Sequence, residues 1–445
     1  MSPPSPESES TELLSVEDLQ EAWNLLVSSD RIESFRALER TEAEDLFLSL
    51  SARDQAELLL ALPANERRSW IRLLAPDDAA DLCQEVTSKE RDELLGLLDD
   101  PTRKEVSGLL AYAEDDAGGL MNPRYTRVRP EMSVDEAITY LRRQASERTA
   151  SLPYAYVLDH DQKLLGVVSY RELFMGRPEQ RVQDVMRTDI VTVPESMDQE
   201  DLSRLFTAHR LIALPVVDDD GRMKGIVTLD DIVDVVREEA TEDIQKIGGT
   251  AALDAPYLRL SVWEMIRKRG GWLAVLFLGE SLTATAMGYF EKEVARAVVL
   301  ALFVPLVISS GGNSGGQATT LIIRAMALGE VRLRDWWHVM RREIMTGLSL
   351  GLILAVIGIV RIVAWEAVFH TYGPHHFMIA LAVAVSLVGV VLWGTLVGSM
   401  LPFVLRRLGA DPATASAPFV ATLVDVTGLV IYFSAAKVLL AGTLL

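Results

Sequence analysis

The sequence predicts a multidomain protein with three folded parts: an all-α superhelical N domain, an α/β domain built from a tandem duplication, and an all-α membrane domain of five transmembrane helices. Three observations carry this prediction. A short helical unit recurs near the N-terminus, a strand pattern occurs twice in the middle, and long apolar stretches fill the C-terminal part. At 445 residues the chain is long enough for several domains.

Charge is distributed unevenly along the chain. Residues 1–270 contain 54 Asp and Glu against 32 Lys and Arg, whereas residues 271–445 contain 9 against 11. We therefore expect the first part to be soluble and acidic, which excludes nucleic acid as a partner and favours cations or basic surfaces. The single cysteine, Cys83, excludes a disulfide framework and a cysteine-based zinc site. Residues 1–16 are rich in Ser, Pro and Glu, and we expect a disordered tail there.

The N domain is expected over residues 17–119. Helix starts recur there at intervals of 12 or 13 residues, and each is followed by polar residues and a Leu-rich end. The starts are Ser51, Pro63, Pro76, Ser88 and Pro101. Proline in a first turn and serine as an N-cap are the expected start signals. Helices this short cannot bury a core alone, so we expect them to stack into a small superhelix.

Residues 120–241 contain an internal duplication. Val157–Ser169 reads VLDHDQKLLGVVS and Val216–Thr228 reads VVDDDGRMKGIVT, with equivalent residues 59 positions apart. Each copy has an apolar strand, a polar turn and a second apolar strand, which predicts a β-hairpin followed by a helix. The pair resembles tandem cystathionine-β-synthase (CBS) domains, a regulatory module. These residues leave open whether the pair binds adenine nucleotide.

An acidic helix is expected after the second copy. Residues 230–243 read DDIVDVVREEATED, and on a helix Asp231, Asp234, Glu238 and Glu242 fall on one face. Like charges at this spacing oppose helix formation by a few tenths of a kcal/mol per pair, and a bridging cation would reverse that effect. A solvated helix face is the alternative. The position just before a basic amphipathic segment and the first membrane span favours a charge-sensitive gate.

Five stretches are long and apolar enough to be transmembrane helices. They cover residues 271–290, 297–323, 344–364, 377–403 and 419–441. Lys and Arg cluster before the first span, between the second and third spans, and after the fourth span. By the positive-inside rule, this pattern places the N-terminal domains in the cytoplasm and the C-terminus outside. Five buried helices of a large soluble protein are the alternative.

Two acidic residues fall inside these spans. Asp425 lies near the middle of the last span, with no cationic residue within a helical turn, so it must be protonated or hold a cation. Because ionisable groups at membrane depth are by default functional, a permeating cation is the favoured interpretation. Glu280, midway along the first span, either lines the cytoplasmic mouth of a pore or is protonated and hydrogen-bonded to Thr283.

The second span contains the motif SSGGNSGGQATT. Ser309, Asn313, Gln317 and Thr320 share one helical face and form a polar stripe. The four glycines predict a broken or irregular backbone, which the membrane tolerates only beside a water-filled path. A glycine-mediated packing face is the alternative. The sequence has no Ser-His-Asp arrangement, P-loop or GxGxxG cradle, and so gives no basis for an enzyme.

The order of short-helix domain, CBS pair, linking helix and five spans resembles the MgtE family of bacterial magnesium channels and transporters. Four signatures carry the resemblance: AGGLM at 117–121, EEATEDI at 238–244, GGNSGGQ at 311–317 and ATLVDVTGL at 421–429. The resemblance implies a Mg²⁺-selective channel that is a homodimer in the lipid bilayer of the inner membrane, with its pore between the protomers. It also implies a plug (connecting) helix over 242–269, followed by a pore domain over 270–445.

The resemblance further implies roles for individual residues. Asp425 falls on the pore metal ligand and Asn313 on a pore-lining position, and we expect Gln317 and Glu280 to line the pore beside them. Cytosolic Mg²⁺ would close the channel by binding acidic residues of the N domain, CBS pair and plug. These are Asp231, Asp234, Glu239, Glu242 and Asp243, with Asp45 and Asp77 in the N domain. A transporter of Co²⁺ or Mn²⁺, or a CBS-gated channel of different ion selectivity, is the alternative.

Overall fold

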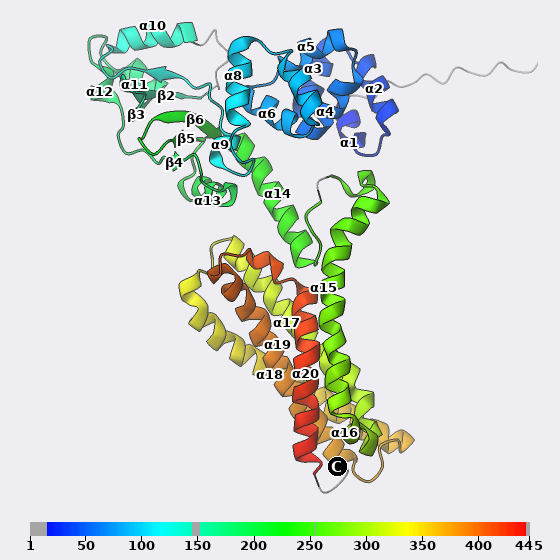
Figure 1. Ribbon diagram of the computed structural model, residues 1–445. Coiled ribbons are helices and arrows are strands. Elements are labelled where there is room, and N and C mark those ends of the chain that lie inside the picture. Colours follow the sequence, from blue (N-terminus) through cyan, green and yellow to red (C-terminus); the bar gives the residue numbers. More distant parts are fainter. Residues whose placement is uncertain (1–15, 145–151, 254, 442–445) are drawn as a thin grey trace, which may run out of the picture. The chain divides into compact units, whose positions relative to one another are not determined.

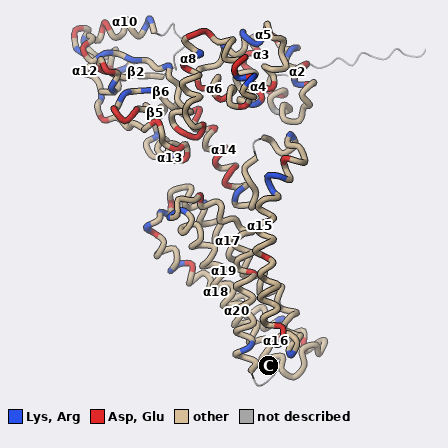
Figure 2. Tube along the Cα trace, in the orientation of Figure 1, with Lys and Arg blue, Asp and Glu red and all other residues tan. Residues whose placement is uncertain are grey.

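The computed structural model describes residues 16–144, 152–253 and 255–441 and divides into two compact units (Figure 1). The N-terminal unit is Met1–Glu239 and the C-terminal unit is Ala240–Leu445. All but the last residue of the predicted disordered tail lies outside the described residues. Charged residues are dense along the N-terminal unit and sparse along the middle of the long helices of the C-terminal unit (Figure 2).

Short helices make up the first part of the N-terminal unit. They are α1 (Val16–Ala22), α2 (Ser28–Ala37), α3 (Arg40–Ser49), α4 (Ala52–Ala61), α5 (Ala64–Ile71), α6 (Pro76–Gln84), α7 (Ser88–Leu95), α8 (Asp100–Leu109) and α9 (Ala117–Leu120). The five predicted starts are confirmed to within one residue. Ser51 caps α4 by accepting a hydrogen bond of 3.3 Å from the amide of Asp54, and Pro76 and Pro101 lie in the first turns of α6 and α8.

The stacked helices bury an apolar core that extends into the duplicated region. Phe47 and Leu59 are completely buried, and the rings of Phe47 and Trp70 lie 5.4 Å apart. The same cluster includes Val216 and Val227, which lie on strands of the second repeat. Because one core joins them, the short helices and the second repeat pack as a single body.

The duplicated region forms two three-stranded sheets of the same topology. The strands are β1 (Arg127–Val128), β2 (Tyr154–Leu158) and β3 (Leu164–Ser169) in the first sheet, and β4 (Val193–Pro194), β5 (Ala213–Val217) and β6 (Met223–Thr228) in the second. In each sheet the first two strands pair in parallel and the last two form an antiparallel hairpin, so both predicted hairpins are confirmed. The helices here are α10 (Val134–Gln144), α11 (Tyr170–Met175), α12 (Val182–Val185) and α13 (Gln199–His209).

The acidic segment after the second hairpin is helical. It forms α14 (Leu229–Ile247), which ends before Gly248 and Gly249. Gly249 has a φ of +74°, a left-handed conformation that glycine adopts without strain. A 3-10 helix over Tyr257–Arg259 precedes the next long helix, α15 (Val262–Tyr289). The range 242–269 therefore contains the end of α14 and the start of α15 as separate helices, and the single connecting helix predicted there is wrong.

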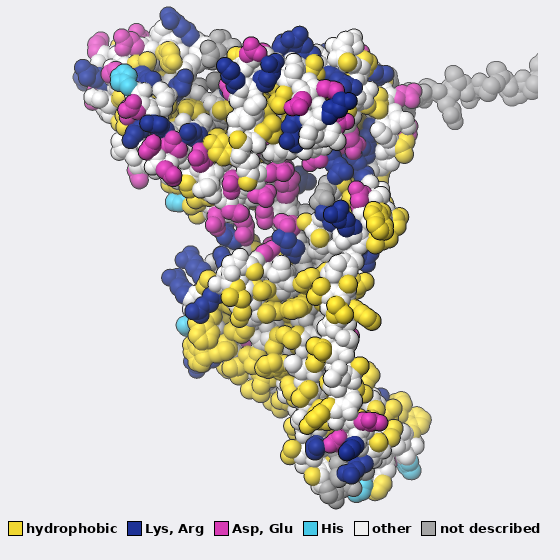
Figure 3. Space-filling model, viewed as in Figure 1, with side chains coloured by type: hydrophobic (Ala, Val, Ile, Leu, Met, Phe, Trp, Pro, Cys, Tyr) yellow, Lys and Arg dark blue, Asp and Glu magenta, His cyan; other side chains and the backbone are white. Residues whose placement is uncertain are grey.

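The C-terminal unit is built from long helices. After α15 these are α16 (Glu291–Arg296), α17 (Val304–Ala327), α18 (Trp336–Phe369), α19 (His376–Arg407) and α20 (Ala417–Leu439), of which only α16 is short. Within the described residues, five helices are long and apolar enough to cross a membrane, as predicted. Apolar side chains cover much of the surface that this unit presents in Figure 3, as expected where a protein faces lipid.

Close backbone contacts hold α17 against α19. A Cβ atom on Gly394 would lie 2.3 Å from the carbonyl oxygen of Gly311, and one on Gly398 would lie 2.1 Å from that of Gly315. The hydroxyl of Thr319 donates a hydrogen bond to the carbonyl of Gly398. Since α17 runs unbroken through the motif, the predicted irregular backbone is wrong, and the alternative of a glycine packing face is confirmed.

α15 runs alongside α20 in the same direction. Near the start of both helices, Nε1 of Trp272 donates a hydrogen bond of 3.2 Å to Oγ of Ser416, the N-cap of α20. Near their other ends, the rings of Phe290 and Phe433 stack with centroids 5.3 Å apart. No residue of α15 itself is buried within the described chain. The first span therefore touches the rest of the unit along one side and exposes the remainder.

Candidate functional site

A groove of about 1150 Å³ lies where α15, α17 and α20 meet. Its polar lining comes from all three helices. The residues are Glu280 and Thr283 of α15, Ser309, Asn313, Gln317 and Thr320 of α17, and Asp425 of α20. The four residues expected to form the pore, Asp425, Asn313, Gln317 and Glu280, thus border one continuous space. This groove is the candidate site of the C-terminal unit.

Asp425 lies beside a glycine of α17. A Cβ atom on Gly312 would lie 3.6 Å from Oδ1 of Asp425, so the absence of a side chain there leaves room next to the carboxylate. Among the described residues, Asp425 has neither an ion pair nor a hydrogen bond. Lys437, on the same helix, pairs instead with Glu293 at 2.7 Å. A carboxylate in this setting is open to a cation that enters the groove.

The polar face of α17 follows the groove. Nδ2 of Asn313 donates a hydrogen bond of 3.4 Å to Oγ of Ser309, and the hydroxyl of Thr320 donates one of 2.9 Å to the carbonyl of Gly316. Asn313 and Gln317 are exposed in the single chain. Neutral oxygens of this kind suit a hydrated cation because they accept hydrogen bonds from its water molecules.

Glu280 and Thr283 lie one turn apart on α15. The hydroxyl oxygen of Thr283 is buried and has no hydrogen-bond partner in the described chain. The alternative in which Glu280 is hydrogen-bonded to Thr283 is therefore wrong. Glu280 also borders a second groove of about 570 Å³, together with Phe277 and Thr422. Its side chain thus lies where α15 packs against α20.

The N-terminal unit gathers carboxylates from α6 and α14. Burial, followed by repulsion from neighbouring acids that include Asp231, raises the pKa of Asp77 and of Asp81 to about 8. Burial likewise raises the pKa of Asp231 to about 6, although hydrogen bonds from Thr228 oppose the rise. Asn122 donates a hydrogen bond of 3.1 Å to Oδ1 of Asp77. Such crowding, in which burial and like charges raise pKa values together, marks a candidate functional site.

Two other regulatory candidates of this unit lie apart from that cluster. Asp45 is exposed on α3, and Asp234 is exposed on α14 with Arg237 3.8 Å away. In the part of the chain that the structure describes, no three His, Cys, Asp or Glu side chains are close enough to hold a metal ion. Of the predicted ligands in this unit, the structure therefore brings Asp77 and Asp231 near each other but forms no complete metal site from them.

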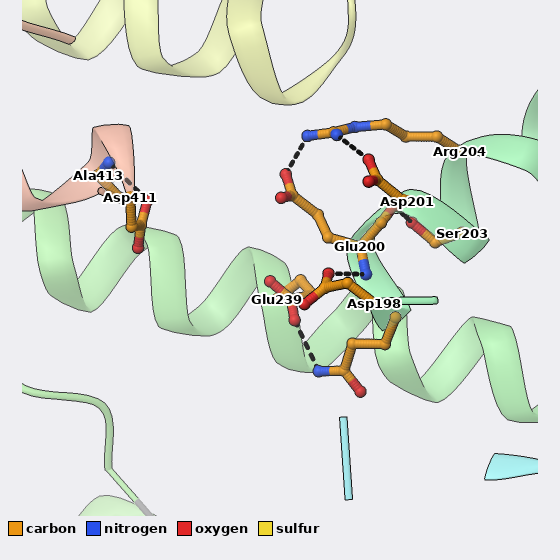
Figure 4. A network of polar contacts seen from close by, with 9 residues as sticks. Asp198, Glu200, Asp201, Ser203, Arg204, Glu239, Asp411 and Ala413 are labelled. Atoms are coloured by element: carbon orange, nitrogen blue, oxygen red, sulfur yellow. Dashed lines mark hydrogen bonds and ion pairs between the residues drawn. The ribbon is translucent and has the colours of Figure 1, made fainter. Parts of the chain in front are cut away.

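Glu239, near the middle of α14, contacts α13. It accepts a hydrogen bond of 2.6 Å from Nε2 of Gln199 (Figure 4). On the next turn of α13, Arg204 forms ion pairs with Glu200 and Asp201. The carboxylate of Glu239 thus faces a neutral amide, whereas its acidic neighbours on α13 are paired with an arginine.

The end of α14 belongs to the C-terminal unit and forms an ion-pair network. Nζ of Lys246 lies 2.5 Å from Glu242 and 2.7 Å from Asp411, a residue of the loop between α19 and α20. Burial lowers the pKa of Lys246, but hydrogen bonds to these two carboxylates raise it overall. Asp411 also accepts a hydrogen bond of 2.8 Å from the amide of Ala413 (Figure 4). Asp243 is half-buried on the same helix.

Sequence reasoning missed three of these residues. Asp81, Asn122 and Lys246 each depend on a partner that is distant in the chain, and Lys246 and Asp411 are 165 residues apart. The position of Asp81 one helical turn after Asp77 was an available signal, because residues four apart share a helix face. No local pattern pointed to Asn122 or Lys246.

Comparison with known proteins gives matches along most of the chain. A family model described as MgtE, divalent cation transporter, matches residues 304–435, the MgtE intracellular N domain matches residues 14–115, and the CBS domain matches residues 117–177 and 182–238. The magnesium transporter MgtE of Thermus thermophilus is 43% identical over 367 residues, which are 82% of this chain and 79% of that protein. The magnesium transporter MgtE of Bacillus subtilis is 32% identical over 368 residues, covering 81% and 77%.

One solved structure is the crystal structure of the cytosolic domain of the Mg²⁺ channel MgtE in complex with ATP. It is 39% identical in sequence, covers 49% of this chain and 90% of that chain, and has a TM-score of 0.46. The family models match this chain in the order N domain, CBS domains and transporter domain, and the transporter model covers the apolar helical C-terminal region. The chain therefore belongs to the MgtE family of divalent cation transporters.

Proposed function

We propose that this chain is the protomer of a Mg²⁺-conducting channel that mediates magnesium uptake, with Asp425 as the ion-binding carboxylate. The observation that carries the proposal is the groove, in which Asp425 stands without a countercharge among the described residues and beside neutral polar groups. The relatives named magnesium transporters support the choice of ion. Asn313, Gln317 and Glu280 line the path.

A second copy of the chain completes the path. In one protomer the polar face of α17 and the carboxylate of Asp425 border an open groove, and polar groups facing hydrocarbon carry a large cost. A homodimer that joins two such grooves encloses the polar groups around water and brings together two Asp425 carboxylates. The exposed apolar side chains of α15 are then shared between the partner and the lipid bilayer.

Two carboxylates suit Mg²⁺ in this setting. Mg²⁺ prefers octahedral oxygen ligands and gives up its water molecules reluctantly, so a wide acidic site holds it through its hydration shell. Two carboxylates about 8 Å apart, at an effective dielectric constant of about 20, repel each other by roughly 2 kcal/mol. A divalent cation between them removes this repulsion and is attracted to both, whereas a monovalent cation gains about half as much.

Gating uses the acids of the N-terminal unit and of α14. Asp77 and Asp231 lie in a crowded acidic cluster, and Asp234, Glu239, Glu242 and Asp243 follow along α14, with Asp45 on α3 as a further candidate. Mg²⁺ bound to these carboxylates relieves their repulsion, so a rise in cytosolic Mg²⁺ favours the state in which they are close together. Several ions acting together give a steep response, because each needs to bias the equilibrium only modestly.

The orientation follows from the charged flanks of the helices. Lys and Arg before α15, between α17 and α18, and after α19 favour a cytoplasmic N-terminal unit and an external C-terminus in a bacterial inner membrane. Binding of adenine nucleotide to the CBS pair would be a second input to the same gate.

Loss of the groove carboxylate tests the proposal. We expect that Asp425→Ala abolishes growth rescue of magnesium-starved cells, whereas Asp335→Ala, an acid-to-alanine change outside the groove, rescues as the unaltered chain does. Normal rescue by Asp425→Ala would remove this residue from the path. Competition of Mg²⁺ uptake by Co²⁺ and Mn²⁺ separates the proposal from a transporter of another divalent cation, for which the competing ion would be taken up preferentially.

A further inference from the structure

Glu280 is an acid in a membrane-spanning helix for which the proposed role of Asp425 gives no account. It lies on α15, whereas Asp425 lies on α20, and both line the groove. Their carboxylates are close enough to repel each other electrostatically. Within the described residues Glu280 has no ion pair and no hydrogen bond. An ionisable side chain at membrane depth without a partner is costly, and such residues usually serve the transported ion.

The packing of α15 on α20 sets the level of Glu280. A Cβ atom on Gly279 would lie 2.9 Å from Cγ2 of Thr422, so the two helices are in close contact at this pair. Glu280 is one residue beyond Gly279, and Asp425 is three residues beyond Thr422. Because the helices run in the same direction, Glu280 lies about 3 Å nearer their N-terminal ends than Asp425 does, at 1.5 Å per residue.

Thr283 supplies a second, independent observation. Thr283 lines the same groove, and its hydroxyl oxygen is buried and has no hydrogen-bond partner among the described residues. A buried hydroxyl without a partner carries a free-energy cost that a ligand or an ordered water molecule would relieve. Thr283 is one turn from Glu280 and lines the same groove, so both residues lie beside the space that a cation would occupy.

We propose that Glu280, with the Thr283 hydroxyl one turn away, forms a second cation-binding position in the groove beside that of Asp425, and that its carboxylate lies nearer the N-terminal ends of α15 and α20 than Asp425 does. The inference rests on the proposed function, since it concerns the path of the same ion. All its ligands are oxygens, as Mg²⁺ prefers. Glu280 supplies the carboxylate of this position, so each protomer contributes one carboxylate there in addition to that of Asp425.

A second position gives the bound ion a way to leave. A divalent cation held by Asp425 carboxylates alone is attracted strongly and departs slowly, and conduction requires binding weak enough, or sites numerous enough, for the ion to move on. A carboxylate a few ångströms further along competes for the ion and shares its charge. Entry of a following ion at Asp425 then repels the first ion away from the pair. Glu280 therefore raises the maximal rate of transport rather than the affinity for entry.

The first experiment measures Mg²⁺ entry into liposomes that contain the purified full chain and a Mg²⁺-sensitive dye. The liposomes are loaded without Mg²⁺, so that closure by internal Mg²⁺ does not limit the initial rate. The variants are Glu280→Gln, which keeps the shape and removes the charge, and Asp425→Asn. The matched control is Ser281→Ala, because Ser281 is exposed on the same helix and its hydroxyl is bonded to the carbonyl of Leu278.

We expect Glu280→Gln to lower the maximal rate per reconstituted protein about five-fold, without raising the half-saturating Mg²⁺ concentration. Ser281→Ala keeps both quantities, and Asp425→Asn stops entry. A Glu280→Gln protein with the unaltered maximal rate, alongside an inactive Asp425→Asn, would overturn the second position and leave the proposed function standing. Full entry through Asp425→Asn would instead overturn the proposed function.

A second experiment, with a cysteine variant at position 280, distinguishes the loss of charge from a fold defect in Glu280→Gln. The only native cysteine, Cys83, is buried, so thiol reagents report on the new residue. In Glu280→Cys, attachment of a sulfonate-bearing methanethiosulfonate should restore the rate towards that of the unaltered chain, and a trimethylammonium-bearing reagent should lower it further. Equal effects of the two reagents would show that charge at this position does not act on the ion. The same labelling of Ser281→Cys provides the control.

Discussion

In the N-terminal unit carboxylates crowd against one another, whereas in the groove of the C-terminal unit they are few and stand beside neutral polar groups. Asp77, Asp81 and Asp231 interact through their charges, and burial raises the pKa of each. Asp425 and Glu280 border a space whose lining combines hydroxyls, amides and glycines with apolar side chains such as Ile308. The chemical group is the same in both regions, but its neighbours differ.

The acidic cluster and the groove also differ in the packing that fixes their side chains in place. The crowded acids come from two separate elements, α6 and α14, so their spacing depends on how those elements pack. The groove is walled by long helices, and α17 and α19 are in contact backbone to backbone through glycines. A region whose packing is opposed by its own charges suits a sensor of cations, while a wall fixed by close packing suits a path that must keep its shape.

The largest effect on transport is expected from neutralising the acids of the N-terminal unit, which we propose sense Mg²⁺. Neutralising Asp231, Asp234 and Glu239 together removes the charges that Mg²⁺ would bridge, so we expect current to persist at millimolar internal Mg²⁺, at about ten times that of the unaltered channel. Patch recordings at varied internal Mg²⁺ measure this.

The control for that triple variant changes the same number of charges elsewhere. Glu66, Asp92 and Glu93 are exposed acids on α5 and α7, and their neutralisation should leave closure unchanged. If the variant that lacks the Asp231, Asp234 and Glu239 charges still closed at the usual internal Mg²⁺, these acids would have no part in sensing, and the proposed difference between the two regions would be wrong.

The rigid wall of the groove is tested by a change without charge. Gly394→Ala places a Cβ atom within 2.3 Å of the carbonyl oxygen of Gly311, and neither backbone can move aside easily. We expect a loss of about 1–3 kcal/mol of stability, as for other overpacked cores, together with lower transport. Thermal unfolding in detergent measures the loss. Gly288→Ala serves as the control because no atom lies within 4 Å of its added Cβ, and equal melting of the two variants would argue against a packed wall.

The fold was predictable where the signal is local and periodic. Helix starts at Ser51 and Pro76 follow from capping chemistry, and the two hairpins follow from apolar runs around polar turns. The five long apolar helices follow from length and composition. In the groove, Asp425 and Glu280 stood out because ionisable residues are rare at membrane depth.

The remainder depends on contacts between distant segments. The glycine-rich motif of α17 was interpreted as a break because a lone glycine run does not reveal what packs against it. A signal was present in α19, where Gly394 and Gly398 are four residues apart and form the spacing typical of close helix packing. The crowding of Asp81 with Asp231 depends on the packing of α6 near α14, which no local pattern encodes.

A smaller effect is expected from a single acid of the crowded cluster. The pKa of Asp81 is raised to about 8 in the folded protein, so the folded state keeps a proton that the unfolded state releases near pH 4. The stability that this proton contributes is present at low pH and is lost as the pH rises from about 4 to 8. We therefore expect α6 to open more readily at pH 8 than at pH 6.

Asp81→Asn should remove part of this dependence. Hydrogen exchange of the α6 amides in the full chain, corrected for intrinsic exchange, should show less opening than the unaltered protein at pH 6 and a larger reduction, of about threefold or more, at pH 8. Asp92→Asn, on the exposed face of α7, is the control. If Asp81→Asn opened like the unaltered chain at both pH values, charge crowding at α6 would not be a source of instability.

The smallest effect is expected from a charged pair that belongs to neither region. Lys437 and Glu293 lie 2.7 Å apart at the far end of α20, and the lysine side chain is 59% exposed. Exposed ion pairs contribute little because water screens them and both side chains lose freedom, so Lys437→Met should shift the unfolding temperature by less than about 1 °C and leave transport unchanged. Should Mg²⁺ entry into liposomes fall more than about twofold, charge outside the groove would control the path. A third charged region, at the far end of α20, would then act on transport in addition to the acidic cluster and the groove.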